Sequence, residues 1–203
     1  MLRCLGVATF LRIFDMQNRW GFAIIILSVL ILDQASKIAV SAQVGLGESV
    51  PVVPGLLHIT LVRNTGMAFG LFSAHSIPYK PLLVTALSIA ALVAVAVYAL
   101  GTPSHNQLSR WGLAFILGGA AGNIIDRIRL GYVTDFVDVF YRQAHWPAFN
   151  VADAAICAGV GLLLLDTLTH REPKEAMSQA SARHWKNLGW PSPDGTNDAT
   201  RCC

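Results

Sequence analysis

Residues 81–100, PLLVTALSIAALVAVAVYAL, decide the fold class of this chain. No charged side chain occurs between Lys80 and Arg110, and the first part of that stretch is almost entirely apolar. A helix needs about 20 such residues to cross the hydrocarbon core of a bilayer. The segment therefore predicts a transmembrane helix, and the glycine, proline and polar residues of 101–108 predict a loop after it.

The composition of the whole chain agrees with a membrane protein. Of its 203 residues, 54% are hydrophobic and only 13% are charged, and the mean hydropathy is +0.51. Soluble domains carry about 25% charged residues. The chain has too little glycine and proline for a collagen-like or disordered protein, and a net charge of +3 indicates no nucleic-acid partner.

Three further apolar runs are each interrupted by aspartate. They are 20–32 before Asp33, 111–125 before Asp126, and 154–165 between Asp153 and Asp166. Each run is too short to cross a bilayer unless its helix continues through the aspartate. We therefore predict four spans, near 20–40, 80–100, 110–128 and 150–169. An ionisable group inside a span costs at least ~2.5 kcal/mol, so each aspartate is a candidate functional residue.

The spans define a membrane domain over residues 16–171. Residues 1–15 form an N-terminal extension, although Met16 could be the true start. Residues 172–203 are polar and contain few aliphatic side chains, which predicts a disordered cytoplasmic tail. The four cysteines and six histidines show no spacing typical of metal ligands, so we expect no metal.

The two connections on the outer side have a different character. Valine, isoleucine and threonine cluster within residues 41–63 between prolines and glycine, which predicts a small sheet at the outer surface. An open sheet edge cannot lie in lipid. Residues 129–147 form a second outer connection that is rich in aromatic side chains, as is typical of a membrane–water interface.

The strongest functional signal is a repeated N-x-x-D motif. Asn123 and Asp126 form its first copy, and Asn150 and Asp153 form its second. Residues three apart share one face of a helix. The first copy ends the third predicted span and the second begins the fourth, and consecutive antiparallel spans bring these ends to the same side of the membrane. We therefore expect Asp126 and Asp153 to lie together at the outer edge of the bilayer.

Two neighbouring carboxylates cannot both ionise at low cost, so they share a proton, as the pair of an aspartic peptidase does. We predict Asp126 and Asp153 to be that catalytic pair. A structural alternative has Asp153 and Asn150 capping the fourth helix while Asp126 pairs with Arg127. In another alternative these aspartates and Asp33 line the path of a small ion- or proton-coupled carrier.

Weaker signals surround these motifs. Asp33 and Lys37 stand four residues apart on one helix face and can form an ion pair near the outer end of the first span. Asn64, Gly66 and Phe69 belong to an N-x-G-x-A-F turn that could support the site, with Phe69 contacting an apolar substrate.

Two more aspartates, Asp135 and Asp138, lie between the two N-x-x-D motifs. They would share a face if their segment were helical, and they are alternative members of the pair. Nothing in the sequence places them at membrane depth, so we interpret them as solvated charges of the outer loop.

Taken together and in order, the motifs closely resemble those of bacterial lipoprotein signal peptidase, or signal peptidase II. They are Asp33-Gln-x-Ser-Lys37, Asn64-x-Gly66-x-Ala-Phe69, Gly122-Asn123-x-x-Asp126-Arg127, Val133-x-Asp135-Phe136 and Phe149-Asn150-x-Ala152-Asp153. The resemblance covers about residues 16–170. It does not extend to the N-terminal extension or to the tail.

The resemblance implies an aspartic endopeptidase of the bacterial inner membrane that uses no metal or cofactor. Such enzymes cut diacylglyceryl-modified prolipoproteins just before the lipidated cysteine. The expected partners are therefore lipidated prolipoproteins and membrane lipid, with no nucleic acid, and we expect a monomer. The family's catalytic aspartates match Asp126 and Asp153. Its supporting polar positions match Asp33, Lys37, Asn64, Gly66, Asn123, Arg127 and Asn150.

The implied fold is a mainly α membrane protein. It has four transmembrane helices, a small periplasmic β-sheet called the cradle, and a periplasmic helix. We match the sheet and the helix to residues 41–63 and 129–147. The active site is expected near the periplasmic face, with both termini in the cytoplasm.

We predict that reporter fusions will place the C-terminus in the cytoplasm and residue 50 in the periplasm. An even number of spans puts both termini on one side. Arginines precede the first span and occupy the loop after the second, at positions 3, 12, 19 and 110, and basic residues favour the inner side. An alkaline phosphatase fusion after residue 50 should be active and one at the C-terminus inactive; the reverse pattern would refute the topology.

Overall fold

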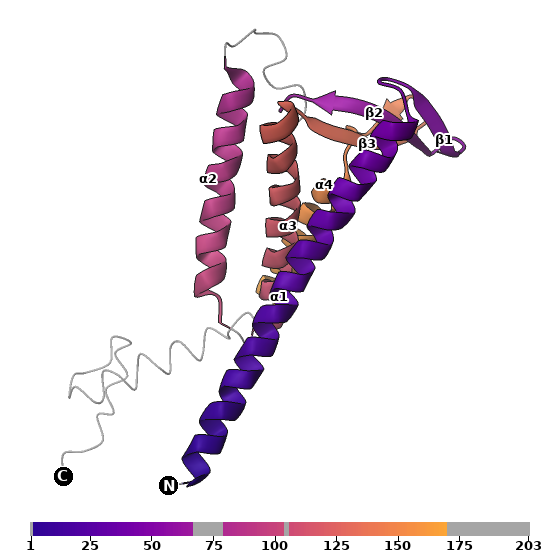
Figure 1. Cartoon of the computed structure of the whole chain (residues 1–203). Helices are drawn as coiled ribbons and strands as arrows, with labels where there is room; N and C mark the ends of the chain where they lie inside the picture. Colours follow the sequence, from indigo (N-terminus) through magenta and orange to yellow (C-terminus); the bar gives the residue numbers. More distant parts are fainter. Residues whose placement is uncertain (1, 67–78, 104–105, 170–203) are drawn as a thin grey trace, which may run out of the picture. The chain divides into compact units, whose positions relative to one another are not determined.

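Four long helices form the membrane part of the protein in this computed structural model, which describes residues 2–66, 79–103 and 106–169 (Figure 1). They are α1 (Leu2–Gln43), α2 (Lys80–Gly101), α3 (Gln107–Leu130) and α4 (Val151–Thr169). Each contains a segment long and apolar enough to cross a bilayer. The four predicted spans are thus confirmed as helices. The predicted tail, 172–203, and Phe69 lie outside the described residues.

Helix α1 differs from the prediction in its length. It is a single helix from Leu2 to Gln43, so the expected N-terminal extension continues directly into the first span. At 1.5 Å per residue its 42 residues reach about 63 Å, roughly twice the thickness of a bilayer core. The apolar segment within it is Trp20–Gln43.

Helix α3 is the central helix of residues 1–165, the compact unit that holds the features described below. Within its apolar window 56% of the residues are buried, against 6% in α2. It packs against both α1 and α2. A second unit, residues 166–203, is described only over 166–169.

Glycines allow α3 to approach its neighbours closely. A Cβ on Gly112 would lie 2.8 Å from the main-chain oxygen of Gly159 on α4, and one on Gly118 would lie 2.9 Å from that of Ile26 on α1. Small residues at such crossings let helix backbones pack against each other where no hydrophobic effect drives association. Glycine spacing therefore sets how close α1 and α4 lie to α3.

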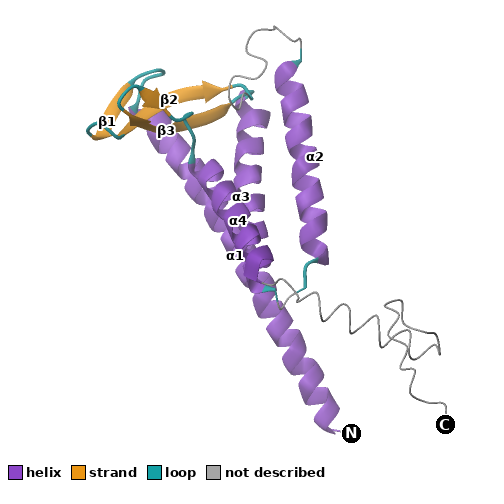
Figure 2. Ribbon diagram, turned by 180° about the vertical axis from the view of Figure 1, so that it is seen from behind, coloured by secondary structure: helices purple, strands orange, loops and turns teal. Residues whose placement is uncertain are grey.

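A four-stranded antiparallel sheet lies at the end of the helices where α1 and α3 finish and α4 begins, with its strands in the order β1-β2-β3-β4 (Figure 2). Its strands are β1 (Ser49–Val53), β2 (Leu57–Asn64), β3 (Val133–Tyr141) and β4 (Ala144–His145). The hairpin of β1 and β2 confirms the sheet predicted within residues 41–63.

The prediction of a helix within residues 129–147 is wrong, because this segment forms β3 and β4. Its sequence from Val133, VTDFVDVFY, is rich in β-branched and aromatic residues, which favour a strand. Antiparallel pairing with β2 supplies the main-chain hydrogen bonds of β3, with Val62 opposite Asp135 and Asn64 opposite Val133. As a result β3 follows the end of α3, and the chain returns through β4 so that Asn150, just before α4, donates to the main-chain oxygen of Thr134 near the start of β3.

We predict that Gly159→Ala will destabilise the protein and that Gly161→Ala will not. Both changes remove a glycine from α4, but a Cβ at 159 would collide with the main-chain oxygen of Gly112, whereas nothing lies within 4 Å of one at 161. Overpacking costs about 1–3 kcal/mol. Thermal unfolding in detergent, followed by tryptophan fluorescence, should show a lower Tm for Gly159→Ala only. Equal Tm values for the two variants would contradict the close helix crossing.

Candidate active site

The start of α4 is closed by a reciprocal pair of hydrogen bonds. Asn150 immediately precedes the helix, and its side-chain oxygen accepts a bond of 3.0 Å from the main-chain N–H of Asp153. In return the main-chain N–H of Asn150 donates to the Asp153 carboxylate at 3.2 Å. This is a capping box, in which two otherwise unsatisfied donors are paired. The predicted capping role of these residues is therefore confirmed, and it fixes the position of the Asp153 carboxylate.

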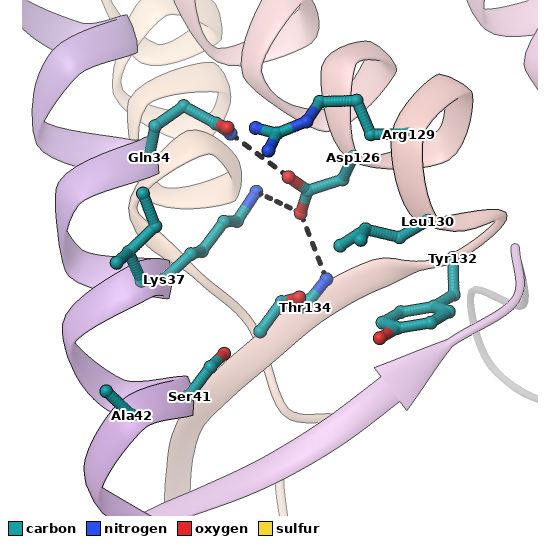
Figure 3. A pocket seen from close by; sticks show the side chains of 10 residues that line it. Gln34, Lys37, Ser41, Ala42, Asp126, Arg129, Leu130, Tyr132 and Thr134 are labelled. Atoms are coloured by element: carbon teal, nitrogen blue, oxygen red, sulfur yellow. Dashed lines mark hydrogen bonds and ion pairs between the residues drawn. The ribbon is translucent and has the colours of Figure 1, made fainter.

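The carboxylate of Asp126 is fully engaged at the end of α3. One oxygen lies 3.0 Å from the ammonium of Lys37 and accepts a bond of 3.1 Å from the main-chain N–H of Thr134. The other oxygen accepts a bond of 3.1 Å from the side chain of Gln34 (Figure 3). The alternative that paired Asp126 with Arg127 is wrong: the partner is Lys37, because α1 packs against this face of α3.

Lys37 joins three acceptors. Besides Asp126, its ammonium contacts Asp33 at 2.9 Å and the side-chain oxygen of Asn123 at 3.0 Å. The predicted Asp33–Lys37 ion pair is confirmed. Asp33 in turn accepts a bond of 2.9 Å from the main-chain N–H of Ala152 in α4. The pair thus ties α1 to both α3 and α4.

Asp135 is buried, so its interpretation as a solvated loop charge is wrong. Only 1% of the residue is exposed. Its two oxygens accept hydrogen bonds of 2.6 Å from Asn150 and 2.9 Å from Asn64. The reason is the strand: residues three apart on a strand point to opposite faces, so Asp135 faces the helices while Asp138 faces outward and bonds His145 at 2.9 Å.

Asn150 links Asp135 to Asp153. Its side-chain amide donates to one carboxylate and its main-chain N–H to the other. Burial raises the pKa of Asp135 to about 6; the hydrogen bond from Asn64 opposes this rise, and the negative charge of Asp153 adds to it. In the described part of the chain, neither carboxylate has a cationic group within 4.0 Å. Asp135 and Asp153 therefore form an electrostatically coupled pair without a counter-ion in direct contact.

The other predicted site residues surround this pair. The side-chain amide of Asn123 donates to Asp153 at 2.8 Å, and Arg127 lies close enough to both carboxylates to interact with their charges. Gly66 has a φ of +107°, and its N–H donates to the side chain of Asn64 at 2.9 Å. This turn orients the Asn64 amide toward Asp135.

Sequence reasoning missed two contributors. The side chain of Gln34 donates to Asp126. Gln34 lies within the quoted motif, three residues before Lys37, and this helical spacing could have indicated that the two side chains share a face. Thr134 contributes through its main chain, donating to Asp126 and accepting from Asn150. A main-chain role leaves no signal in the residue type. Over the residues that the structure describes, no cluster of three potential metal ligands is present.

This geometry agrees with comparisons to known proteins. The family model of signal peptidase II, described as "Signal peptidase (SPase) II", matches residues 25–169. The chain belongs to this family. It is 45% identical over 147 residues to the lipoprotein signal peptidase of Geobacter metallireducens, covering 72% of this chain and 90% of that protein. With the lipoprotein signal peptidase of Geobacter sulfurreducens it shares 42% identity over 153 residues, 75% and 94% of the two chains.

A solved structure of a bacterial membrane enzyme is also similar to this chain. The TM-score is 0.64 at 30% sequence identity, and the match covers 74% of this chain and 94% of that one. The family match, residues 25–169, includes the C-terminal part of α1, the other three helices and the sheet.

We predict that the burial of Asp135 will appear as a pH dependence of stability. Its folded pKa of about 6 lies above the ordinary 3.8, so the unfolded chain loses this proton first as pH rises. Wild-type stability should fall between pH 4 and pH 6, by at most about 3 kcal/mol at 1.36 kcal/mol per pKa unit. The difference in Tm between wild type and Asp135→Asn, followed from pH 4 to pH 7, should change in this window. A difference independent of pH would contradict the raised pKa.

Proposed function

We propose that this chain is a membrane aspartic endopeptidase that removes signal peptides from diacylglyceryl-modified prolipoproteins, cutting before the lipidated cysteine. Membership of the signal peptidase II family supports the reaction and the substrate class. The observation that carries the proposal is the coupled pair of carboxylates, Asp135 and Asp153, joined through Asn150.

We propose Asp135 and Asp153 as the catalytic pair, in place of the predicted Asp126 and Asp153. The cation of Lys37 and two other donors hold Asp126. Both oxygens of this carboxylate are therefore occupied by partners within the protein. Asp135 is buried and has a pKa near the working range of an acid catalyst. The role assigned here to Asp126 is to anchor β3 through the main chain of Thr134.

The two environments divide the chemistry between acid and base. Asp153 lies in the first turn of α4, where hydrogen bonds from Asn123 and from the main chain of Asn150 hold its carboxylate in place to act as the base. It takes a proton from water as the water oxygen bonds to the scissile carbonyl carbon. Protonated Asp135 donates a hydrogen bond to the carbonyl oxygen. When the C–N bond breaks, the leaving amine of the lipidated cysteine accepts a proton from the pair.

The remaining residues position this pair. Asn123 and Asn150 hold Asp153, while Asn64 and the turn at Gly66 hold Asp135. Arg127 supplies positive charge near the carbonyl oxygen as its negative charge develops.

Further roles and the membrane setting complete the proposal. Asp33 and Lys37 keep α1 in place, and Phe69 contacts apolar substrate. The protein acts as a monomer without a metal or cofactor. It lies in the bacterial inner membrane with both termini in the cytoplasm and the site near the periplasmic face.

Single and double Asp→Asn variants test the assignment. Asp135→Asn and Asp153→Asn should each lose at least ~100-fold in rate, the lower range for acid–base catalysis. The double variant should be little worse, because both residues serve one proton transfer. Asp126→Asn should keep more activity than either. The measurement is a gel-shift assay on diacylglyceryl-prolipoprotein in detergent, without any ion gradient, at equal amounts of folded protein.

Asp138→Asn is the matched control, because Asp138 lies on the same strand but faces His145. It should cleave at near the wild-type rate. Near-normal cleavage by Asp135→Asn, together with loss in folded Asp126→Asn, would restore Asp126 to the pair. If wild type cleaves only across an ion gradient, the peptidase proposal fails.

A further inference from the structure

A cavity of about 330 Å³ lies beside the Lys37–Asp126 pair, on the side of α1 and α3 that carries Gln34 and Arg129 (Figure 3). Its walls are the last turns of α1 and α3 and the start of β3. Ligand sites in proteins begin at about 300 Å³, so the space suits a small headgroup rather than a whole lipid or peptide. None of the proposed catalytic steps uses it.

Of the two cationic side chains that line this cavity, only Lys37 is neutralised by acidic partners among the described residues. Lys37 is shared by Asp33 and Asp126. Arg129 reaches from α3 into the cavity toward Gln34 and Asp126 (Figure 3), yet within the described chain it makes no hydrogen bond or ion pair. The hydroxyl groups of Ser41 and Tyr132 also line the space.

A second arginine lies next to this cavity. The Arg63 guanidinium sits 5.0 Å above the ring of Tyr132, and Arg63 pairs in the sheet with Thr134, which also lines the cavity. Arg63 is exposed, and it too has no acidic partner in the described ranges. Lys37, Arg63 and Arg129 therefore outnumber Asp33 and Asp126 by one positive charge.

The rim of the cavity is apolar. Ile38 is 64% exposed and Leu130 is 47% exposed. Both belong to the apolar segments of α1 and α3, which end here. A cationic cavity with a lipid-facing apolar rim, at the end of transmembrane helices, combines the two features of a phospholipid: a phosphate group joined to acyl chains.

We infer that this cavity binds the headgroup of an anionic phospholipid, with Arg129 donating to the phosphodiester and Arg63 adding positive charge. Guanidinium groups suit phosphate because their N–H donors match its oxygens in pairs. The hydroxyls of Ser41 and Tyr132 face the glycerol part, while Ile38 and Leu130 contact the start of the acyl chains. The site is separate from the carboxylate pair and anchors the end of α3 to the surrounding lipid.

Lipid retention on the purified full chain tests this inference. Native mass spectrometry in detergent would follow binding of dioleoylphosphatidylglycerol to wild type, Arg129→Gln, Arg63→Gln and Arg142→Gln. Arg142 is the matched control, because it is exposed and stacks 5.5 Å from Tyr141 but does not line the cavity. Arg129→Gln should weaken binding at least about tenfold, since it removes a hydrogen bond between charged groups. Arg63→Gln should have a smaller effect, and Arg142→Gln none.

Two further ligands identify what the cavity recognises. Dioleoylglycerol has the same acyl chains without phosphate and should bind all four proteins equally weakly. Inorganic phosphate should not displace the phospholipid at equal concentration. Effective displacement by phosphate would show a free-anion site instead and overturn the inference. The inference would also be overturned if Arg129→Gln and Arg142→Gln retained dioleoylphosphatidylglycerol equally while both kept the wild-type Tm.

Discussion

The rest of the structure depends on the interactions that the buried ammonium group of Lys37 makes with its three acceptors. Charge burial is costly, and it is tolerated only where partners satisfy every donor. Lys37 meets this condition with Asp33, Asp126 and Asn123, which together come from α1 and α3. Because Asp33 also accepts a hydrogen bond from the Ala152 N–H, one cation links the C-terminal ends of α1 and α3 to the start of α4.

This arrangement separates a structural carboxylate from a reactive pair. Asp126 neutralises Lys37 and holds the first residues of β3 through Thr134. The next residue, Asp135, points toward the helices, where the side chains of Asn150 and Asn64 donate hydrogen bonds to its carboxylate. A change at Asp126 would therefore affect the site through the position of a strand, whereas Asp135 and Asp153 interact directly through their charges. Three carboxylates within one hydrogen-bonded network thus have different physical roles.

The two sides of α3 present different groups to their surroundings. α3 presents glycines toward both α1 and α4, and toward α1 it also presents Asp126 and the cavity with Arg129. The unpaired arginine and the paired lysine lie only a few side chains apart (Figure 3). Their difference follows from burial: Lys37 is 4% exposed and requires internal partners, while Arg129 is exposed and open to an external anion.

The sequence by itself determined the four spans, the β1–β2 hairpin, the Asp33–Lys37 pair and the cap of α4 by Asn150 and Asp153. Each of these rests on short-range spacing or on the length of an apolar run, which a linear pattern records. The tertiary structure decided that Asp135 is buried and that Lys37 is the partner of Asp126. The burial of Asp135 depends on β3 pairing with β2, which lies some 70 positions earlier in the chain, as in the Asn64–Asp135 contact. The Lys37–Asp126 pair depends on α1 packing against α3. Helix spacing placed Asp126 beside the second motif, but only the strand, with its two-residue alternation, could turn Asp135 toward Asp153 and leave Asp138 outside.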